Sequence, residues 1–164
     1  MELNSSVSLL NFSFGLFKGC YSDDGNTLVS PLSVMLALSM AAEGADGETL
    51  SAFLRVLSPN APISDFSASL AEYVKSLPSD EKTAFSFADS IWVREGLKLK
   101  WLFARRNRSL FKAEISELPF DSEAVRKINA WVDKSTKGMI PEIISSANPE
   151  AMMYLINALA FEAE

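Results

Sequence analysis

The chain has 164 residues, 48% of them hydrophobic and 22% charged, as expected of one soluble globular domain with room for a core. Its 15 basic and 21 acidic residues give a net charge of −6, which argues against nucleic acid as a partner. With one cysteine and no histidine, the sequence excludes an internal disulfide, a multi-cysteine zinc site and nucleophiles activated by histidine. Any enzyme of this composition would have to act through carboxylate, lysine or tyrosine side chains. We expect no metal, no other cofactor and no catalytic residue.

The first half of the chain is predicted to be helical. Apolar residues recur at helical spacing from Asn4 to Tyr21, and three further segments continue the pattern: 32–42, 48–57 and 63–77. No run of about 18 uncharged apolar residues occurs, so neither a transmembrane helix nor a membrane partner is expected. The N-terminal residues have no basic region and no small-residue cleavage site, so no signal peptide is visible.

The segment before the second helix combines several signals. Residues 26–29 fit a short buried strand, and Ser30 followed by Pro31 is a favourable N-cap and first helical residue. From Leu32 to Ala42 the helix is apolar on nearly every side, which predicts that it is covered all round.

In the second half the period changes. Residues 85–93 alternate and contain aromatic and β-branched side chains, which predicts a strand. The following pattern predicts a helix over 100–110, a strand over 113–119 and a helix from Ser122 to Gly138 capped by Asp121 or Ser122.

The last segment, from Met152 to Phe161, is a nearly continuous apolar run, MMYLINALAF. Such a run is typical of a central strand covered on both faces. Because the sequence ends at Glu164, only one neighbouring strand can come from the preceding residues. We therefore expect an incomplete domain in which this strand leaves one edge unpaired and makes the chain prone to self-association.

Several blocks, taken together, resemble the N-terminal part of the serpins, a family of serine protease inhibitors. They stand in the family's order and spacing: LNFSFGLF at 10–17, NTLVSPLS at 26–33, GADGETL at 44–50, ADSIWV at 88–93, INAWV with TKGMI at 128–140, and LINALAF at 155–161. The last block departs from the family pattern at Ala160, where an aromatic is common, and at Glu162, where a lysine is common.

The resemblance implies an α+β fold in which residues 1–164 are the N-terminal part of a single serpin domain. It would supply helices A to F and three strands of the large sheet A, and end before the remaining sheets and the reactive-centre loop. The intact protein would be a suicide inhibitor of serine or, in some members, cysteine endopeptidases, its cleaved loop inserting into sheet A. The scissile bond is absent, so the chain is expected neither to inhibit alone nor to be an enzyme.

Three polar residues match the shutter, the point where sheet A opens: Ser30, Ser33 and Asn157. The side chain of an Asn inside an apolar run must find hydrogen-bond partners, or its burial costs about 1–3 kcal/mol of stability. Hydroxyl groups at the N-terminus of a helix are suitable partners. A simpler interpretation stays open, in which Ser30 only caps a helix, Ser33 fills core space and Asn157 bonds the backbone.

Other interpretations also remain open. The only dense basic cluster is either a polyanion site or, as we favour, a solvated face: Lys98, Lys100, Arg105, Arg106, Arg108 and Lys112. The intact protein is either an inhibitor with a target protease as partner or a non-inhibitory carrier or chaperone. Outside the family, the chain fits a stand-alone α+β interaction module. The resemblance favours an extracellular location, with the cytoplasm as the alternative.

An unpaired strand and a self-contained module predict different solution behaviour. If the segment from Met152 to Phe161 has an open edge, size-exclusion chromatography of the purified chain should show concentration-dependent association. A self-contained module should instead elute as a monomer at every concentration and unfold in one cooperative urea transition. The second result would contradict the expected incomplete domain.

Overall fold

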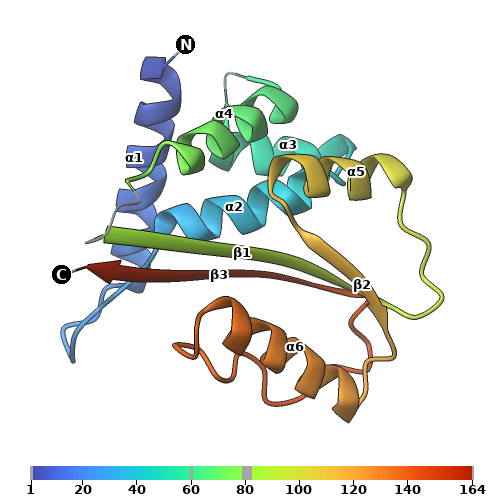
Figure 1. The fold of residues 1–164 in the computed structure, drawn as a ribbon. Coiled ribbons are helices and arrows are strands. Elements are labelled where there is room, and N and C mark those ends of the chain that lie inside the picture. The colour runs from blue at the N-terminus through green and yellow to red at the C-terminus, as the bar shows by residue number, and fades with distance from the viewer. Residues whose placement is uncertain (1, 60, 79–82, 164) are drawn as a thin grey trace. The chain divides into compact units, whose positions relative to one another are not determined.

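A computed structural model describes residues 2–59, 61–78 and 83–163. These residues form six helices and three strands (Figure 1). They divide into two compact units, Met1–Lys75 and Ser76–Glu164, each of which is described by itself.

The first unit consists of helices, as the apolar spacing predicts. They are α1 (Glu2–Cys20), α2 (Pro31–Ala42), α3 (Gly47–Leu57) and α4 (Ile63–Lys75). Helix α2 contacts each of the other three and so forms the centre of this unit.

The start of α2 is built as the sequence predicts. Ser30 is the N-cap, its Oγ accepts a hydrogen bond from the Ser33 backbone N at 3.3 Å, and Pro31 is the first helical residue. The expectation that α2 is covered all round is wrong for this chain. Met35 and Met40 are buried, whereas Val34, Leu38 and Ala41 on the opposite side of the helix keep part of their surface exposed.

The prediction of a strand over residues 26–29 is also wrong. These residues have no regular secondary structure, and the Leu28 side chain is 96% exposed. A strand depends on a neighbour that completes its backbone hydrogen bonds, and no described strand pairs with this segment. Two β-branched residues in a run of four are too weak a signal without such a neighbour.

Helix α1 has the predicted amphipathic pattern, but its apolar stripe is mostly uncovered. The large residues of the stripe are between 44% and 72% exposed: Val7, Leu10, Phe14 and Phe17.

The second unit is built on a three-stranded sheet in the order β2-β1-β3. Strand β1 (Thr83–Arg94) is central and runs parallel to β2 (Glu114–Leu118) and antiparallel to β3 (Met153–Ala163). Strand β3, predicted as a central strand with one neighbour missing, therefore lies at an edge of the described sheet.

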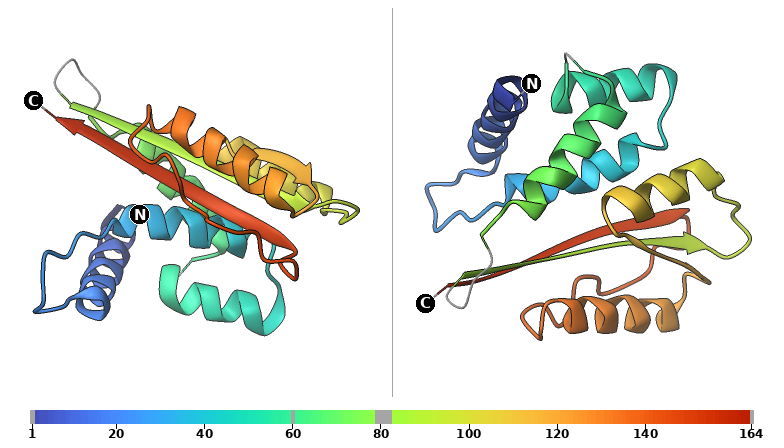
Figure 2. Two further views of the ribbon diagram at one scale, coloured as in Figure 1. Left: turned by 90° about the horizontal axis from the view of Figure 1, so that it is seen from below. Right: turned by 45° about the horizontal axis from the view of Figure 1, so that its top comes forward.

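Two helices cover opposite faces of this sheet, α6 (Ser122–Ser135) on one and α5 (Trp101–Leu110) near one end of the other (Figure 2). The core under α6 joins Trp92 and Ile156 of the sheet to Ile128 and Val132 of the helix. Burying each aliphatic side chain of this size contributes roughly 1.5–3 kcal/mol. Trp131 packs edge-on against Trp92, with 6.2 Å between the ring centroids.

The N-terminus of α6 depends on one side chain. Asp121 Oδ1 accepts hydrogen bonds from the backbone N atoms of Glu123 and Ala124, both at 2.9 Å. The prediction that Asp121 or Ser122 caps this helix is thus resolved in favour of Asp121.

Replacing Asp121 by Ala should lower the free energy of unfolding by about 1 kcal/mol, measured by urea titration. The neighbouring Ser122→Ala serves as the control and should change little, and equal losses in both variants would contradict the assignment.

Candidate functional site

Asn157 is paired with a buried carboxyl group on the neighbouring strand. Asp89 of β1 and Asn157 of β3 are register partners, and Asn157 Nδ2 donates to Asp89 Oδ1 at 2.8 Å. Because side chains alternate along a strand, both lie on the face opposite the Trp92 and Ile156 side chains that pack under α6. The pair therefore belongs to the sheet face away from α6.

Burial controls the ionisation of this carboxyl group. Asp89 is only 7% exposed, and the loss of hydration raises its pKa from 3.8 to about 6. The hydrogen bond from Asn157 acts in the opposite direction but is the smaller effect. Asp89 is therefore a buried acid that titrates close to neutral pH.

The amide of Asn157 is only half satisfied. Its Oδ1 is buried and has no hydrogen-bond partner among the described residues. A protonated carboxyl group is a donor as well as an acceptor, so a neutral Asp89 has the chemistry to pair with both ends of a primary amide. An ionised Asp89 can only accept.

Ser30 and Ser33 lie in the first unit, whereas Asn157 lies in the second. Ser30 Oγ is engaged in capping α2, and Ser33 Oγ is buried without a partner among the described residues. A shared network of the two hydroxyls with Asn157 therefore stays a prediction.

The connection from α6 to β3 is held against the helix by an amide. Asn129 Nδ2 donates to the backbone O of Ile144 at 2.8 Å, and its Oδ1 accepts from the backbone N of Ile143 and Ile144 at 3.0 and 3.1 Å. One side chain thus satisfies three backbone groups of an irregular segment, which have no secondary-structure partner.

The end of this connection is held by the sheet. Arg94 of β1 donates to the backbone O of Pro149 and, from Nε at 2.8 Å, to that of Ala151. The Tyr154 hydroxyl accepts from the backbone N of Asn148 at 2.6 Å. We call residues 136–152 the strap, because side chains of α6, β1 and β3 hold this segment down.

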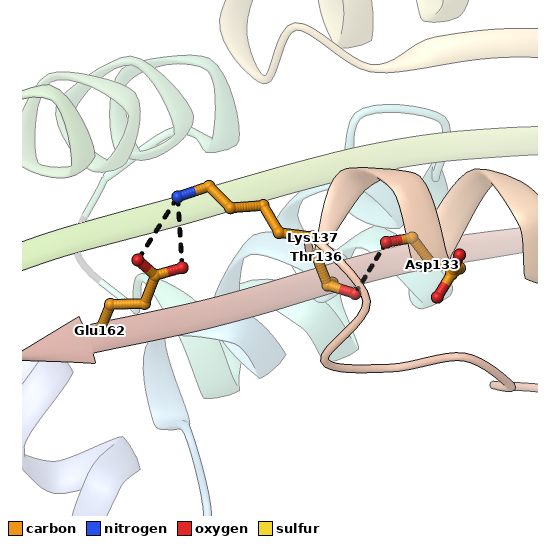
Figure 3. Close-up of polar contacts among 4 residues, drawn as sticks. All are labelled: Asp133, Thr136, Lys137 and Glu162. Carbon is orange, nitrogen blue, oxygen red and sulfur yellow. Dashed lines mark hydrogen bonds and ion pairs between the residues drawn. The ribbon is translucent and has the colours of Figure 1, made fainter.

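The strap begins with a tight helix end (Figure 3). Gly138 N donates to Asp133 O at 2.8 Å and Lys137 N to Lys134 O at 3.3 Å, the pattern of a Schellman motif with left-handed φ angles of 52° at Lys137 and 84° at Gly138. Lys137 Nζ reaches Glu162 of β3, with an N–O distance of 3.2 Å. Glu162, which departs from the family pattern, thus pairs with a cation at the end of α6. Both side chains are largely exposed, so the pair contributes at most about 1 kcal/mol.

No metal-binding cluster accompanies these residues in the part of the chain that the structure describes. Within the ranges 2–59, 61–78 and 83–163, no three His, Cys, Asp or Glu side chains come together where they could hold a metal ion. None of the described helices combines the length and apolarity needed to cross a membrane.

Comparison with known proteins now decides the family. The serpin (serine protease inhibitor) family model matches residues 8–164. The chain belongs to the serpin family. It is 32% identical over 165 residues to an uncharacterized serpin-like protein of Thermococcus kodakarensis, covering 96% of this chain. Human alpha-1-antichymotrypsin is 28% identical over 172 residues, covering all of it.

Solved serpin structures share the fold. The thermophilic serpin tengpin in its latent state superimposes with a TM-score of 0.92 and 43% identity, covering 96% of this chain and 43% of tengpin. The native state of tengpin gives a TM-score of 0.89. This serpin chain spans 38% of the length of the Thermococcus protein and 41% of that of antichymotrypsin.

The sequence singled out Asn157 but missed its partner. Asp89 carries a visible signal, since it is the one charged residue in an alternating segment whose same-face neighbours are Phe87 and Ile91. Asn129 is harder to detect, because an Asn on a helix is usually solvated, and its role depends on a segment fifteen residues later.

The buried carboxyl group makes stability depend on pH. Between pH 3.8 and about 6 the folded state binds the Asp89 proton more tightly than the unfolded chain, so its contribution to the free energy of unfolding falls as pH rises. Asp89→Asn, neutral at every pH, should therefore be more stable than the wild type by roughly 2–3 kcal/mol at pH 7.5. The difference should vanish near pH 3, below the pKa of the unfolded chain. Urea titrations at the two pH values measure it, with exposed Asp24→Asn as the control. A gain independent of pH would contradict the assignment.

Proposed function

We propose that this serpin, at full length, inhibits a serine or cysteine endopeptidase by inserting its cleaved reactive-centre loop into sheet A. The observation that carries the proposal is the position of β3, which pairs with β1 along its length and has no partner on its other edge among the described strands. A strand added at this edge would gain a row of backbone hydrogen bonds. This gain would provide free energy for distorting the bound protease.

In this proposal Asp89 and Asn157 act as part of the shutter, together with Ser30 and Ser33. The cross-strand bond of 2.8 Å fixes the Asn157 amide on the sheet face away from α6. Its Oδ1 and the Ser33 Oγ are buried acceptors without described partners, so both are available for bonds that change when the sheet opens. Hydrogen bonds are suited to this role because they break and re-form without covalent chemistry.

The strap would have to yield during insertion. Partly buried apolar residues such as Ile140 and Ile144 pack against the core under α6. The rest of the strap is held by hydrogen bonds from Asn129, Arg94 and Tyr154. Each such bond contributes about 0.5–1.5 kcal/mol, or up to about 3 where a charge is involved, so the strap can detach stepwise while α6 keeps its own core.

The target protease would be the partner of the full-length protein, and an extracellular site of action is part of the proposal by resemblance to the family. Residues 1–164 would supply three strands of the sheet that receives the loop, and no residue among them would be cleaved by the target.

Covalent trapping tests the proposal. The full-length protein should form an SDS-resistant complex with an active serine or cysteine protease and abolish its activity at a stoichiometric ratio, whereas residues 1–164 alone should form none. An active-site Ser→Ala protease is the control and should form no complex. Cleavage of the full-length protein by every protease of a broad panel without a covalent complex would contradict inhibition and favour a carrier or chaperone.

A further inference from the structure

A cavity of about 560 Å³ lies within the second unit, between α5, β2 and the turn that follows β1. Its apolar lining comes from five residues: Val93, Leu97, Leu99, Ala104 and Ile115. Val93 and Ala104 are buried, so this part of the lining is a stable floor and not a set of mobile surface chains. A cavity of this size accommodates a small organic molecule.

Two cations stand at the cavity, Lys98 from the turn and Arg108 from α5. Both are exposed, and neither forms an ion pair or hydrogen bond with any described residue. They belong to a stretch, residues 96–113, that contains six basic and no acidic residues in a chain of net charge −6. The positive charge at the cavity is thus concentrated locally and not neutralised by neighbours in sequence.

Two polar residues complete the lining. Glu117 Oε1 accepts from the backbone N of Gly96 at 2.7 Å, which fixes the turn at the rim, where Gly96 has a φ of 83°. Ser116 adds a hydroxyl group. With Lys98 and Arg108, the charged lining keeps an excess of one positive charge. The other residues of the basic cluster do not line the cavity, and Arg105 lies over the Trp101 ring at 5.6 Å.

We propose that this cavity binds an amphipathic anion, a carboxylate with an unbranched apolar tail such as a medium-chain fatty acid. The apolar floor would bury the tail, each methylene group contributing about 0.8 kcal/mol. Arg108 offers the paired donors that bind a carboxylate in a bidentate manner, and Lys98 adds a second charge. This site is independent of the shutter and of protease inhibition.

The test is isothermal titration calorimetry of residues 1–164 with decanoate, decanol and acetate. Decanoate should bind saturably at one site, while decanol should bind at least tenfold more weakly and acetate not detectably. Arg108→Gln should weaken decanoate binding by roughly tenfold or more, because a charged hydrogen bond is lost. Glu117→Gln should strengthen it by removing the one negative charge of the lining.

The matched control is Arg105→Gln, which removes the same charge from the same helix outside the cavity. It should leave decanoate affinity within about twofold of the wild type, while Ala104→Leu, which fills the floor, should abolish binding. Circular dichroism checks that each variant folds. If Ala104→Leu does not fold, the comparison of Arg108→Gln with Arg105→Gln decides.

Equal losses in Arg105→Gln and Arg108→Gln, equal affinity for decanol, or no saturable binding would each overturn the proposal. The first of these results would instead indicate a general polyanion surface.

Discussion

The register between β1 and β3 is the constraint on which the rest of the second unit depends. Pairing from Thr83 with Ala163 to Val93 with Met153 sets Asp89 opposite Asn157 and Trp92 opposite Tyr154. Because side chains alternate across a strand, a slip by one residue would turn Asn157 toward α6 and remove Ile156 from the core. The packing of Ile156 and Ala158 under α6 therefore determines which face of the sheet Asn157 occupies. The position of its amide does not depend on the hydrogen bonds that the amide itself forms.

Helix α6 and the strap attach to this sheet by different physical means. The helix contributes Ile128 and Val132 to a buried apolar core, which resists gradual separation. The strap packs a few partly buried apolar side chains, Ile140 and Ile144 among them, against this core. It is otherwise attached by side chains that satisfy backbone groups, as Asn129 does for Ile143 and Ile144. Water can replace such bonds one at a time. The unit thus combines a rigid helix–sheet contact with a connection whose hydrogen bonds can open locally, as the proposed insertion of a strand would require.

Elements with a hydrophobic pattern or capping residues of their own could be predicted from the sequence. The alternation in β1, the apolar run of β3 and the capping residues Ser30 and Asp121 are local signals, and each is found close to its predicted place. The failures depend on distant partners. Residues 26–29 lack a neighbouring strand, and the partner of Asn157 lies 68 residues away, so it is set by register and not by any pattern near Asn157. The joint arrangement of Ser30, Ser33 and Asn157 spans two units and stays a prediction for the same reason.

The lysine at the end of α6 carries two opposed contributions that respond differently to the solvent. At Lys137 the backbone occupies a left-handed conformation that glycine adopts more easily, a cost of order 1 kcal/mol, while its ammonium group is attracted to Glu162. Dissolved ions screen the attraction but leave the backbone angle unchanged. Rising salt concentration therefore weakens the attraction between Lys137 and Glu162 but keeps the backbone strain at Lys137. The junction of α6 with the strap should lose stability as the salt concentration rises.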